Sequence, residues 1–347
     1  MRRPALLGFA IVLMLAPAVI ARTWYIAPNG TGDAPNIQAG IDSATAGDTV
    51  LVSCGIYYES GIHMRSGVVL LGDTTEGDSA IIDAQERFNV LNCAGCDGTT
   101  IIEGLTIKNG KREDWYPTQG GGMDLASCYL TIRRCVFSEN KASYGAAVFA
   151  FGGQVAIEDC IFTKNYAGEG AAIFISYMNM TIRSCTFVGN YSDKGTVFIQ
   201  SYRGSQILDC TFYANEAGSG SGIYCADFSS PTIGRTVFCG GLRGHPVSCG
   251  YASAPVLGCC DIYGNMGGDW VGCVADQFGV NGNFSADPGF CDAEGGDFFL
   301  EECSPCLPGN HPDGVYCWGT IGAHEAECAC TGPIRSSTWG GIKSMYR

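Results

Sequence analysis

The sequence has few basic residues and few histidines. It contains 20 Lys and Arg against 34 Asp and Glu, which gives a formal net charge of −14. That sign disfavours binding to nucleic acid or to anionic membrane surfaces. The four histidines, at positions 63, 245, 311 and 324, lack metal-ligand spacing, so no metal or cofactor is expected. No run of 18 uncharged apolar residues follows residue 21, so we expect no transmembrane segment in the mature chain.

The first 21 residues are typical of an export signal. Arg2 and Arg3 precede an apolar run, Ala5–Ile20, and the small residue Ala21 follows it. We expect cleavage after Ala21, which leaves 18 Lys and Arg against 34 acids, a net charge of −16. The mature protein is therefore expected to be extracytoplasmic, either secreted or held at the cell surface.

A sequence repeat organises the middle of the chain. Fifty glycines and only 16% charged residues favour many short strands joined by tight turns. Four segments align without gaps at an offset of 25 residues: Thr131–Phe149, Ala156–Phe174, Thr181–Ile199 and Gln206–Tyr224. A fixed period of this length indicates a solenoid, and the short β-rich runs favour strands over helices. The sequence predicts an all-β parallel β-helix with coils of about 25 residues.

Each column of the alignment becomes a ladder along the axis of such a helix, because equivalent strands stack about 4.8 Å apart. We expect the Ile and Phe columns and a Cys column to point inward, and an Asn column to lie at a turn, where Asn tolerates a left-handed conformation. The ladders are Ile132, Ile157, Ile182 and Ile207; Cys135, Cys160, Cys185 and Cys210; Phe137, Phe162, Phe187 and Phe212; and Asn140, Asn165, Asn190 and Asn215, with Asn265 as a further member. Outside, Arg133, Glu158 and Arg183 alternate in charge, which opposes register slips.

The ends of a β-helix need covers. Asn36 is a candidate N-cap for a short helix over Ile37–Ala46 whose Ile37, Ile41 and Ala44 face the first coil. The expected organisation is a signal at 1–21, an N-terminal cap and first coil at 22–60, coils at 61–265, a Cys-rich cap at 266–330 without regular strands, and a basic tail at 331–347.

Twenty cysteines in an exported chain predict disulfides, concentrated in the last third. The cysteines of the repeat are expected to stay unpaired, because a parallel ladder aims their side chains alike. Cys93-x-x-Cys96 and Cys303-x-x-Cys306 could form zinc knuckles, but disulfides are favoured at both.

Several segments resemble bacterial right-handed β-helix repeat proteins of the pectin lyase-like superfamily. The resemblance lies in Trp24–Glu59, Asp287–Phe290, Asp297–Leu300, Ser304–Cys306 and Gly322–His324. It implies a right-handed helix with an N-terminal capping helix. It does not select an activity, because the superfamily contains lyases, hydrolases, esterases and adhesins.

No catalytic motif of these enzymes is found in the sequence. A hydrolase would need an acid and a base flanking the glycosidic bond. Gly244-His245-Pro246 is a poor match for the Gly-His-Gly motif of the polygalacturonase-like enzymes. A lyase would need a carboxylate cluster for calcium and a basic residue. Asp83, Glu103, Asp159 and Asp209 fall in different columns or beside charged residues. We therefore expect neither a catalytic residue nor a cofactor, with calcium needed only if the protein is a lyase.

Aromatic residues are the candidate ligand-binding residues. Tyr166 and Tyr191 are one period apart, as are Tyr177 and Tyr202, and the insertion Lys111–Gln119 carries Trp115 and Tyr116. Rings spaced along a rod suit the apolar faces of sugars, although tyrosine is also a good strand residue. The favoured hypothesis is a non-enzymatic β-helix that binds polysaccharide or a cell-surface glycan. The alternatives are a divergent polysaccharide lyase or hydrolase, and a structural surface rod.

Overall fold

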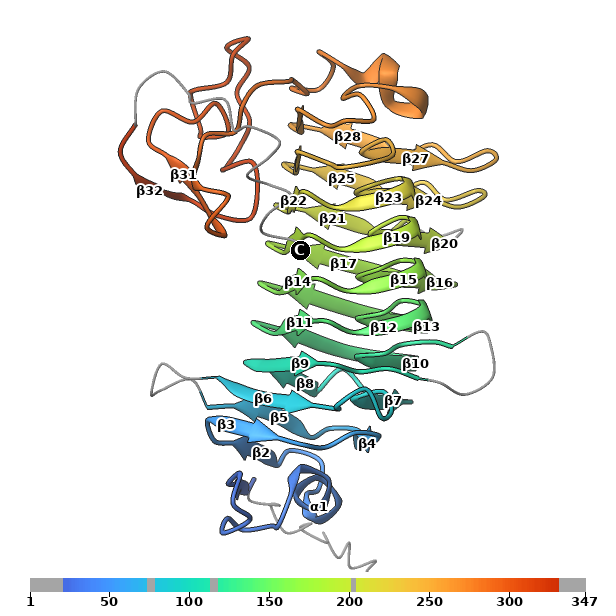
Figure 1. Cartoon of the computed structure of the whole chain (residues 1–347), viewed down its shortest axis with the longest axis vertical. Helices are drawn as coiled ribbons and strands as arrows, with labels where there is room; N and C mark the ends of the chain where they lie inside the picture. Colours follow the sequence, from blue (N-terminus) through green and yellow to red (C-terminus); the bar gives the residue numbers. More distant parts are fainter. Residues whose placement is uncertain (1–20, 74–78, 113–117, 201–203, 331–347) are drawn as a thin grey trace, which may run out of the picture.

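Successive coils of the chain stack along one axis, and each places its strands beside the equivalent strands of the previous coil (Figure 1). The computed structural model describes residues 21–73, 79–112, 118–200 and 204–330. The predicted tail at 331–347, and all of the predicted signal except Ala21, lie outside the described residues. Strands of neighbouring coils pair in parallel, which confirms the predicted parallel β-helix.

The largest sheet covers two faces of the helix. Its 16 strands in the described residues are β1 (Thr23–Ile26), β2 (Thr49–Val52), β4 (Ile62–His63), β5 (Val69–Gly72), β7 (Leu91–Ala94), β8 (Thr100–Glu103), β10 (Met123–Arg133), β13 (Val148–Glu158), β16 (Ile173–Ser176), β17 (Asn179–Arg183), β20 (Val197–Gln200), β21 (Gln206–Leu208), β24 (Ile223–Cys225), β25 (Thr232–Gly234), β27 (Val247–Cys249) and β28 (Val256–Gly258). The long strand β10 joins the faces, because its first part pairs with β7 and its last part with β8.

Two further parallel sheets complete the coils. One contains β3 (Gly55–Tyr57), β6 (Ala80–Asp83), β9 (Leu105–Lys108), β11 (Val136–Ser138), β14 (Ile161–Thr163), β18 (Thr186–Val188), β22 (Thr211–Tyr213), β26 (Val237–Cys239) and β29 (Asp261–Tyr263). The other contains β12 (Lys141–Tyr144), β15 (Tyr166–Glu169), β19 (Tyr191–Lys194) and β23 (Glu216–Ser219), and its first three strands form the floor of the site described below.

Apolar ladders fill the interior. Ile132, Ile157, Ile182 and Ile207 are in register and fully buried. The rings of Phe137, Phe162, Phe187 and Phe212 stack at centroid distances of 4.9, 4.9 and 4.4 Å with nearly parallel planes. Burying each Phe stabilises the fold by about 1.5–3 kcal/mol, and the stacking adds to this.

The asparagine ladder is a buried hydrogen-bonded chain. Each of Asn140, Asn165 and Asn190 donates from Nδ2 to the next Asn Oδ1 at 3.0–3.1 Å, and also to a Phe or Ile carbonyl of the preceding coil. Asn265 repeats the pattern, since its Nδ2 donates to Phe238 O at 3.0 Å.

The expectation that these asparagines adopt the left-handed conformation is wrong. The positive φ belongs to the residue before each one, at Glu139, Lys164, Gly189 and Ala214. The left-handed residue turns the chain and points outward, which directs the following amide into the interior.

The cysteines of the repeat are unpaired and buried. Each thiol donates to backbone carbonyls; that of Cys160, for example, lies 3.2 Å from Glu158 O and 3.9 Å from Ile132 O. Burial raises the pKa of the Cys135 and Cys185 thiols well above the usual range. These thiols therefore act as small apolar side chains.

The outer charges pair differently from the sequence prediction. Arg133 does not pair with Glu158 but with Glu103 of the preceding coil, at 2.6 Å, and Arg134 contacts the same carboxylate. Arg183 and Arg235 share Asp209, at 3.1 and 2.5 Å. Glu103 lies directly opposite Arg133 on the preceding coil, whereas Asp209 follows Leu208, the residue directly opposite Arg183.

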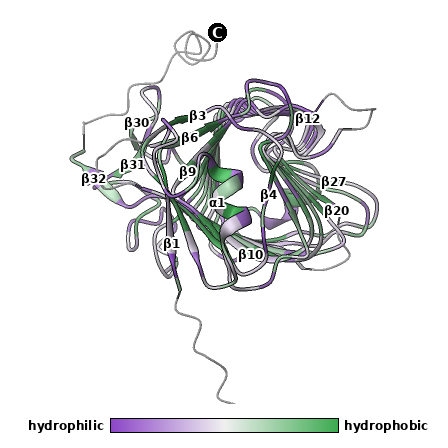
Figure 2. Cartoon of the chain, turned by 90° about the horizontal axis from the view of Figure 1, so that it is seen from below, coloured by the Kyte–Doolittle hydropathy of each residue, from purple (hydrophilic) through white to green (hydrophobic). Residues whose placement is uncertain are grey.

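The N-terminal helix α1 (Ile37–Ser43) lies across the first coil (Figure 2). Asn36 is its N-cap, and its Oδ1 accepts from Ala39 N at 2.8 Å. Ile37, Ile41 and Ala44 are fully buried, as expected. The helix is shorter than predicted because Ala44 adopts an extended conformation.

The Cys-rich segment contains regular strands, contrary to the sequence prediction. The 3₁₀ helix η1 (Gly272–Gln277) lies beyond the last coil, where Val274 joins the main core. The strands β30 (Phe290–Asp292), β31 (Asp297–Glu301) and β32 (Ala326–Cys328) then form a sheet on the flank of the helix (Figure 1). His324 Nε2 lies 2.9 Å from Thr186 Oγ1 there, and Ala323 N donates to Thr211 Oγ1 at 3.0 Å. Only part of this segment therefore covers the end.

Four disulfides link this segment: Cys249–Cys273, Cys259–Cys317, Cys291–Cys328 and Cys303–Cys330. The disulfide expectation is wrong for Cys93 and Cys96, which are buried free thiols, and for Cys306. The thiol of Cys128 lies beside Cys93 and Cys96 and donates to Cys93 O at 3.2 Å. No helix within the described residues is long and apolar enough to cross a membrane.

Candidate functional site

A cleft of about 550 Å³ opens on the outer face of the four-stranded sheet. Its floor comes from β12, β15 and β19, and its wall from the described ends of the Lys111–Gln119 insertion. Lys111, Arg112 and Thr118 lie at these ends and line the cleft. Thr118 is fixed to the floor, since Ser143 N donates to its Oγ1 at 2.9 Å.

Two stacked tyrosines lie in the four-stranded sheet, and Tyr166 lines the cleft. Tyr166 of β15 and Tyr191 of β19 are in register, and their ring centroids lie 5.1 Å apart with planes only 2° from parallel. The side chain of Tyr166 is 54% exposed. Parallel strands stack them because identical residues one coil apart project in the same direction. They form a flat aromatic platform in which Tyr166 is exposed and Tyr191 is half-buried.

Basic side chains gather at the cleft although the protein is acidic. Five lysines occur between residues 21 and 330, and Lys111, Lys141 and Lys194 line this one cleft. Glu86 lies between two of them, 3.7 Å from Lys111 and in direct contact with Lys141. The hydrogen bond from Lys141 lowers the pKa of Glu86.

Two of the carboxylates at the cleft are held in ion pairs, and a third, Asp193, lines the cleft and is exposed. Glu169 Oε1 lies 2.9 Å from Lys194 Nζ, and this hydrogen bond raises the pKa of Lys194. Asp124 Oδ2 lies 3.2 Å from Arg112. Burial raises the pKa of Asp124, while the Arg112 charge acts in the opposite direction. The cleft therefore presents a flat ring surface, hydroxyls and paired charges, a combination suited to holding a polar ring compound.

The structure brings only some of the sequence-predicted binding residues together. Tyr166 lines the cleft and Tyr191 stacks on it, whereas Tyr177 lies on a different edge of the helix. Trp115, Tyr116 and Tyr202 lie outside the described residues. Sequence reasoning missed Lys141 and Lys194. Lys141 could have been found, because it precedes Tyr166 by one period and pairs with it in register.

The acids considered from the sequence do not form a catalytic pair. Glu103 and Asp209 are each bonded to two arginines, and Asp83 accepts from Asn109 Nδ2 at 2.9 Å. These carboxylates support the stacking of coils.

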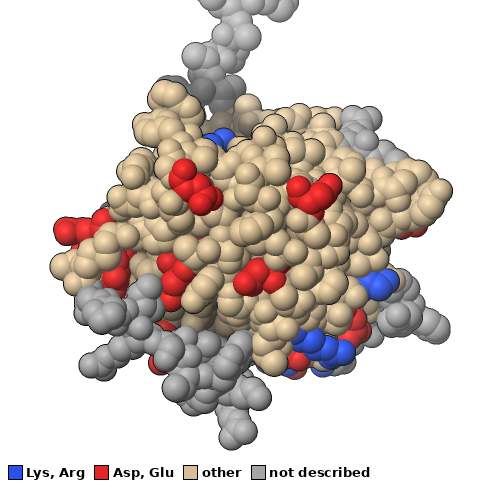
Figure 3. All heavy atoms as spheres, turned by 90° about the horizontal axis from the view of Figure 1, so that it is seen from above, with Lys and Arg blue, Asp and Glu red and all other residues tan. Residues whose placement is uncertain are grey.

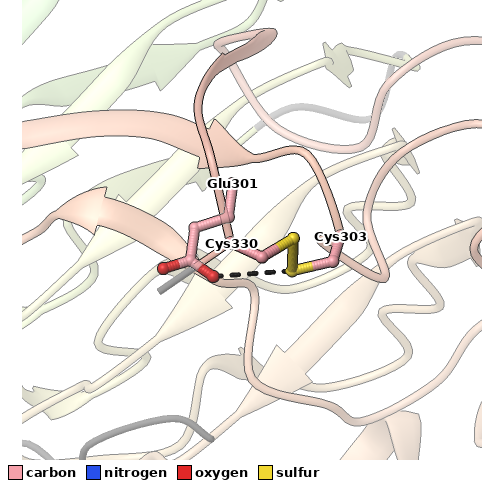
Figure 4. A group of neighbouring side chains, drawn as sticks. All are labelled: Glu301, Cys303 and Cys330. Carbon is pink, nitrogen blue, oxygen red and sulfur yellow. Dashed lines mark hydrogen bonds between the residues drawn. A yellow bond between two sulfur atoms is a disulfide. The ribbon is translucent and has the colours of Figure 1, made fainter. Parts of the chain in front are cut away.

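Glu301, Cys303 and Cys330 form the one cluster of potential metal ligands in the described part of the chain (Figure 4). The two cysteines are joined as a disulfide, with Cys303 Sγ 3.6 Å from Glu301 Oε2. Metal ligation by cysteine requires a thiolate. In this oxidised form only the carboxylate is a good metal ligand, so the cluster is a structural contact.

No protein-family model and no curated protein matches the sequence. Among solved structures, the chain is similar to the pectin methylesterase from Aspergillus niger in deglycosylated form, at 15% identity and a TM-score of 0.45. The match covers 77% of this chain and 95% of that one. The parallel strand register of this chain defines its β-helix.

Proposed function

We propose that this protein is a non-enzymatic, extracytoplasmic β-helix that binds a polysaccharide or cell-surface glycan in the cleft of β12, β15 and β19. The observation that carries the proposal is the parallel stack of the exposed Tyr166 on the half-buried Tyr191. Four disulfides support an oxidising, extracytoplasmic location.

The chemistry of the cleft fits a sugar ring. The C–H face of a sugar stacks on the tyrosine platform, as apolar ring faces do on aromatic side chains. Thr118 and Ser143 are hydroxyl partners for sugar hydroxyls, and Lys141 and Lys194 can donate to further oxygens. Glu169 is already paired with Lys194, and this ion pair favours a role in ligand binding over a role as a proton-transfer group.

A glycan-array screen of the secreted protein tests this function. Bound glycans are then incubated with the protein, with and without calcium, and examined for new reducing or unsaturated ends. Retention without cleavage is the expected result. Cleavage would establish the alternative of a lyase or hydrolase. Failure to bind any glycan would favour the other alternative, a structural surface rod.

Replacing both Tyr166 and Tyr191 by alanine is expected to weaken retention of the bound glycan about tenfold, equivalent to about 1.4 kcal/mol. The melting temperature should stay near that of the wild type, because Tyr166 faces solvent and Tyr191 lies outside the buried core. Surface plasmon resonance measures the affinity. Tyr58→Ala is the matched control, since Tyr58 is 61% exposed but lies outside the cleft. Equal affinity of the double variant and the wild type would contradict the proposal.

A further inference from the structure

A nearly buried carboxylate lies beside Arg22, the first residue after the expected cleavage site. This carboxylate belongs to Asp48, which directly precedes β2 and is only 5% exposed. Its Oδ1 accepts a hydrogen bond from the backbone N of Arg22 at 2.7 Å. Its Oδ2 accepts from Thr45 N at 2.9 Å, from Thr45 Oγ1 at 3.0 Å and from Trp24 Nε1 at 3.4 Å. In the uncleaved chain all four donors are neutral groups.

The negative charge of Asp48 has no basic side chain as a partner within the described residues. The backbone hydrogen bonds from Thr45 and Arg22 lower the pKa of Asp48 to about 2, so the carboxyl is ionised at neutral pH. The guanidinium of Arg22 is directed elsewhere, since it lies 3.7 Å from the centre of the Trp24 ring and 3.9 Å from Asp33 Oδ1. Buried charges in proteins are normally compensated by an opposite charge.

Cations are scarce throughout the protein. The chain expected after cleavage has 18 Lys and Arg against 34 acids. Figure 3 shows the same imbalance on the end of the helix opposite α1, where acidic side chains outnumber basic ones. A carboxylate at the N-terminal cap therefore has few basic side chains available to it.

The backbone of Arg22 is fixed in place by the first coil. Thr49 N donates to Arg22 O at 2.9 Å. The next residue, Thr23, begins β1 and is opposite Thr49 of β2 in parallel register. Ala21, before it, is exposed. The Ala21–Arg22 peptide bond thus lies where the ordered β-helix begins, and its nitrogen is held against the Asp48 carboxylate.

We propose that the Ala21–Arg22 bond is a processing site, and that the α-ammonium formed there pairs with Asp48 and completes the N-terminal cap. A signal peptidase adds one water across the amide bond. Ala21 leaves with the new carboxylate, and the proton that this acid releases is bound by the new amine of Arg22. The ordinary pKa of an α-amine is about 7.7–8.0, so the group is a cation at neutral pH. One neutral donor to Asp48 becomes a cation without moving, and the two opposite charges attract.

A simpler account gives Asp48 only a role in its own turn. Asp48 N donates to Thr45 O at 2.9 Å, and both the N and the Oγ1 of Thr45 donate back to the carboxylate. These bonds explain an aspartate at the end of this turn. They do not involve the chain terminus, so that account expects the same stability whether residue 22 begins the chain or follows another residue. The proposal expects a difference.

The test compares two proteins secreted from the full-length gene with its own leader. Intact-mass spectrometry of the wild type is expected to give the mass of a chain that begins with Arg22. In the second protein Gly-Ser is inserted between Ala21 and Arg22, so the terminal amine moves two residues away and Arg22 N remains an amide. The wild type is expected to melt at least about 2 °C higher than the insertion variant.

Asp48→Asn is then introduced into both proteins, and the difference in melting temperature between them should vanish. A second measurement does not depend on the stability of Asp48→Asn. Acylation of the terminal amine at pH 7, followed by peptide mass spectrometry, should be at least tenfold slower in the wild type than in the insertion variant, because the ion pair holds its amine protonated.

Three results would overturn the proposal. The first is a secreted protein that keeps its leader or begins at a residue other than Arg22. The second is a wild type that melts at the same temperature as the insertion variant, or a difference that persists with Asp48→Asn. The third is an equal rate of acylation in the two proteins, which would show that Asp48 does not hold the terminal charge.

Discussion

Asn190→Ala is expected to lower the free energy of unfolding by about 3–5 kcal/mol. The Asn190 side chain is fully buried and makes five hydrogen bonds, including one from Nδ2 to Val188 O at 3.4 Å. Its Nδ2 donates to Phe162 O at 2.8 Å and to Asn215 Oδ1 at 3.0 Å. Its Oδ1 accepts from both the backbone N and the Nδ2 of Asn165. Alanine would leave these partners buried without a bond and would also create a cavity.

Urea unfolding followed by circular dichroism measures this loss. Asn179→Ala is the matched control, because Asn179 is exposed, and it should change the stability by less than about 0.5 kcal/mol. A loss at Asn190 no larger than that of the control would mean that the ladder does not contribute to the stability of the coils.

Asp261→Asn is expected to stabilise the protein, and by more as the pH rises. Asp261 is fully buried, and burial raises the pKa of its carboxyl well above the usual range. Ala286 N and the Cys306 thiol contact its oxygens, while Asp287 and Asp269 add negative charge nearby. The folded protein therefore holds a proton that the unfolded chain releases above about pH 4.

The sign of the effect follows from this difference in proton binding. Because the folded state binds more protons, the wild type loses about 1.4 kcal/mol for each pH unit between about pH 4 and the raised folded pKa. Asparagine does not titrate, so thermal melts from pH 4 to 8 should diverge progressively in its favour. Asp276→Asn, at an exposed aspartate, is the control and should show no such divergence. Parallel melting curves for wild type and Asp261→Asn would contradict the assignment of a neutral carboxyl.

Much of the coil could be predicted from the sequence, because each ladder places the same type of side chain in the same environment on successive coils. Phe162 and Phe187 share an environment, so their 25-residue spacing predicted their stacking. The backbone was less predictable. The left-handed residue can be Glu139, Lys164 or Ala214, and these types have no common preference for that conformation, because the outward turn imposes it.

The rest depends on contacts between segments far apart in the sequence. The strand β31 forms only where the flank of the helix covers it, with Phe298 5.2 Å from the Tyr213 ring. The periodic tyrosines Tyr166 and Tyr191 could be predicted as neighbours, but the cleft needs an irregular insertion whose path has no period.

The in-register stacking of whole coils also affects how such a chain can evolve. Because Cys135, Cys160 and Cys185 occupy equivalent positions, a gene that loses or duplicates one 25-residue coil still encodes matching neighbours on both sides. The protein would change in length by about 4.8 Å for each coil, with both end caps unaltered. Rod length is therefore a trait that recombination can adjust in steps, without the need for a new core.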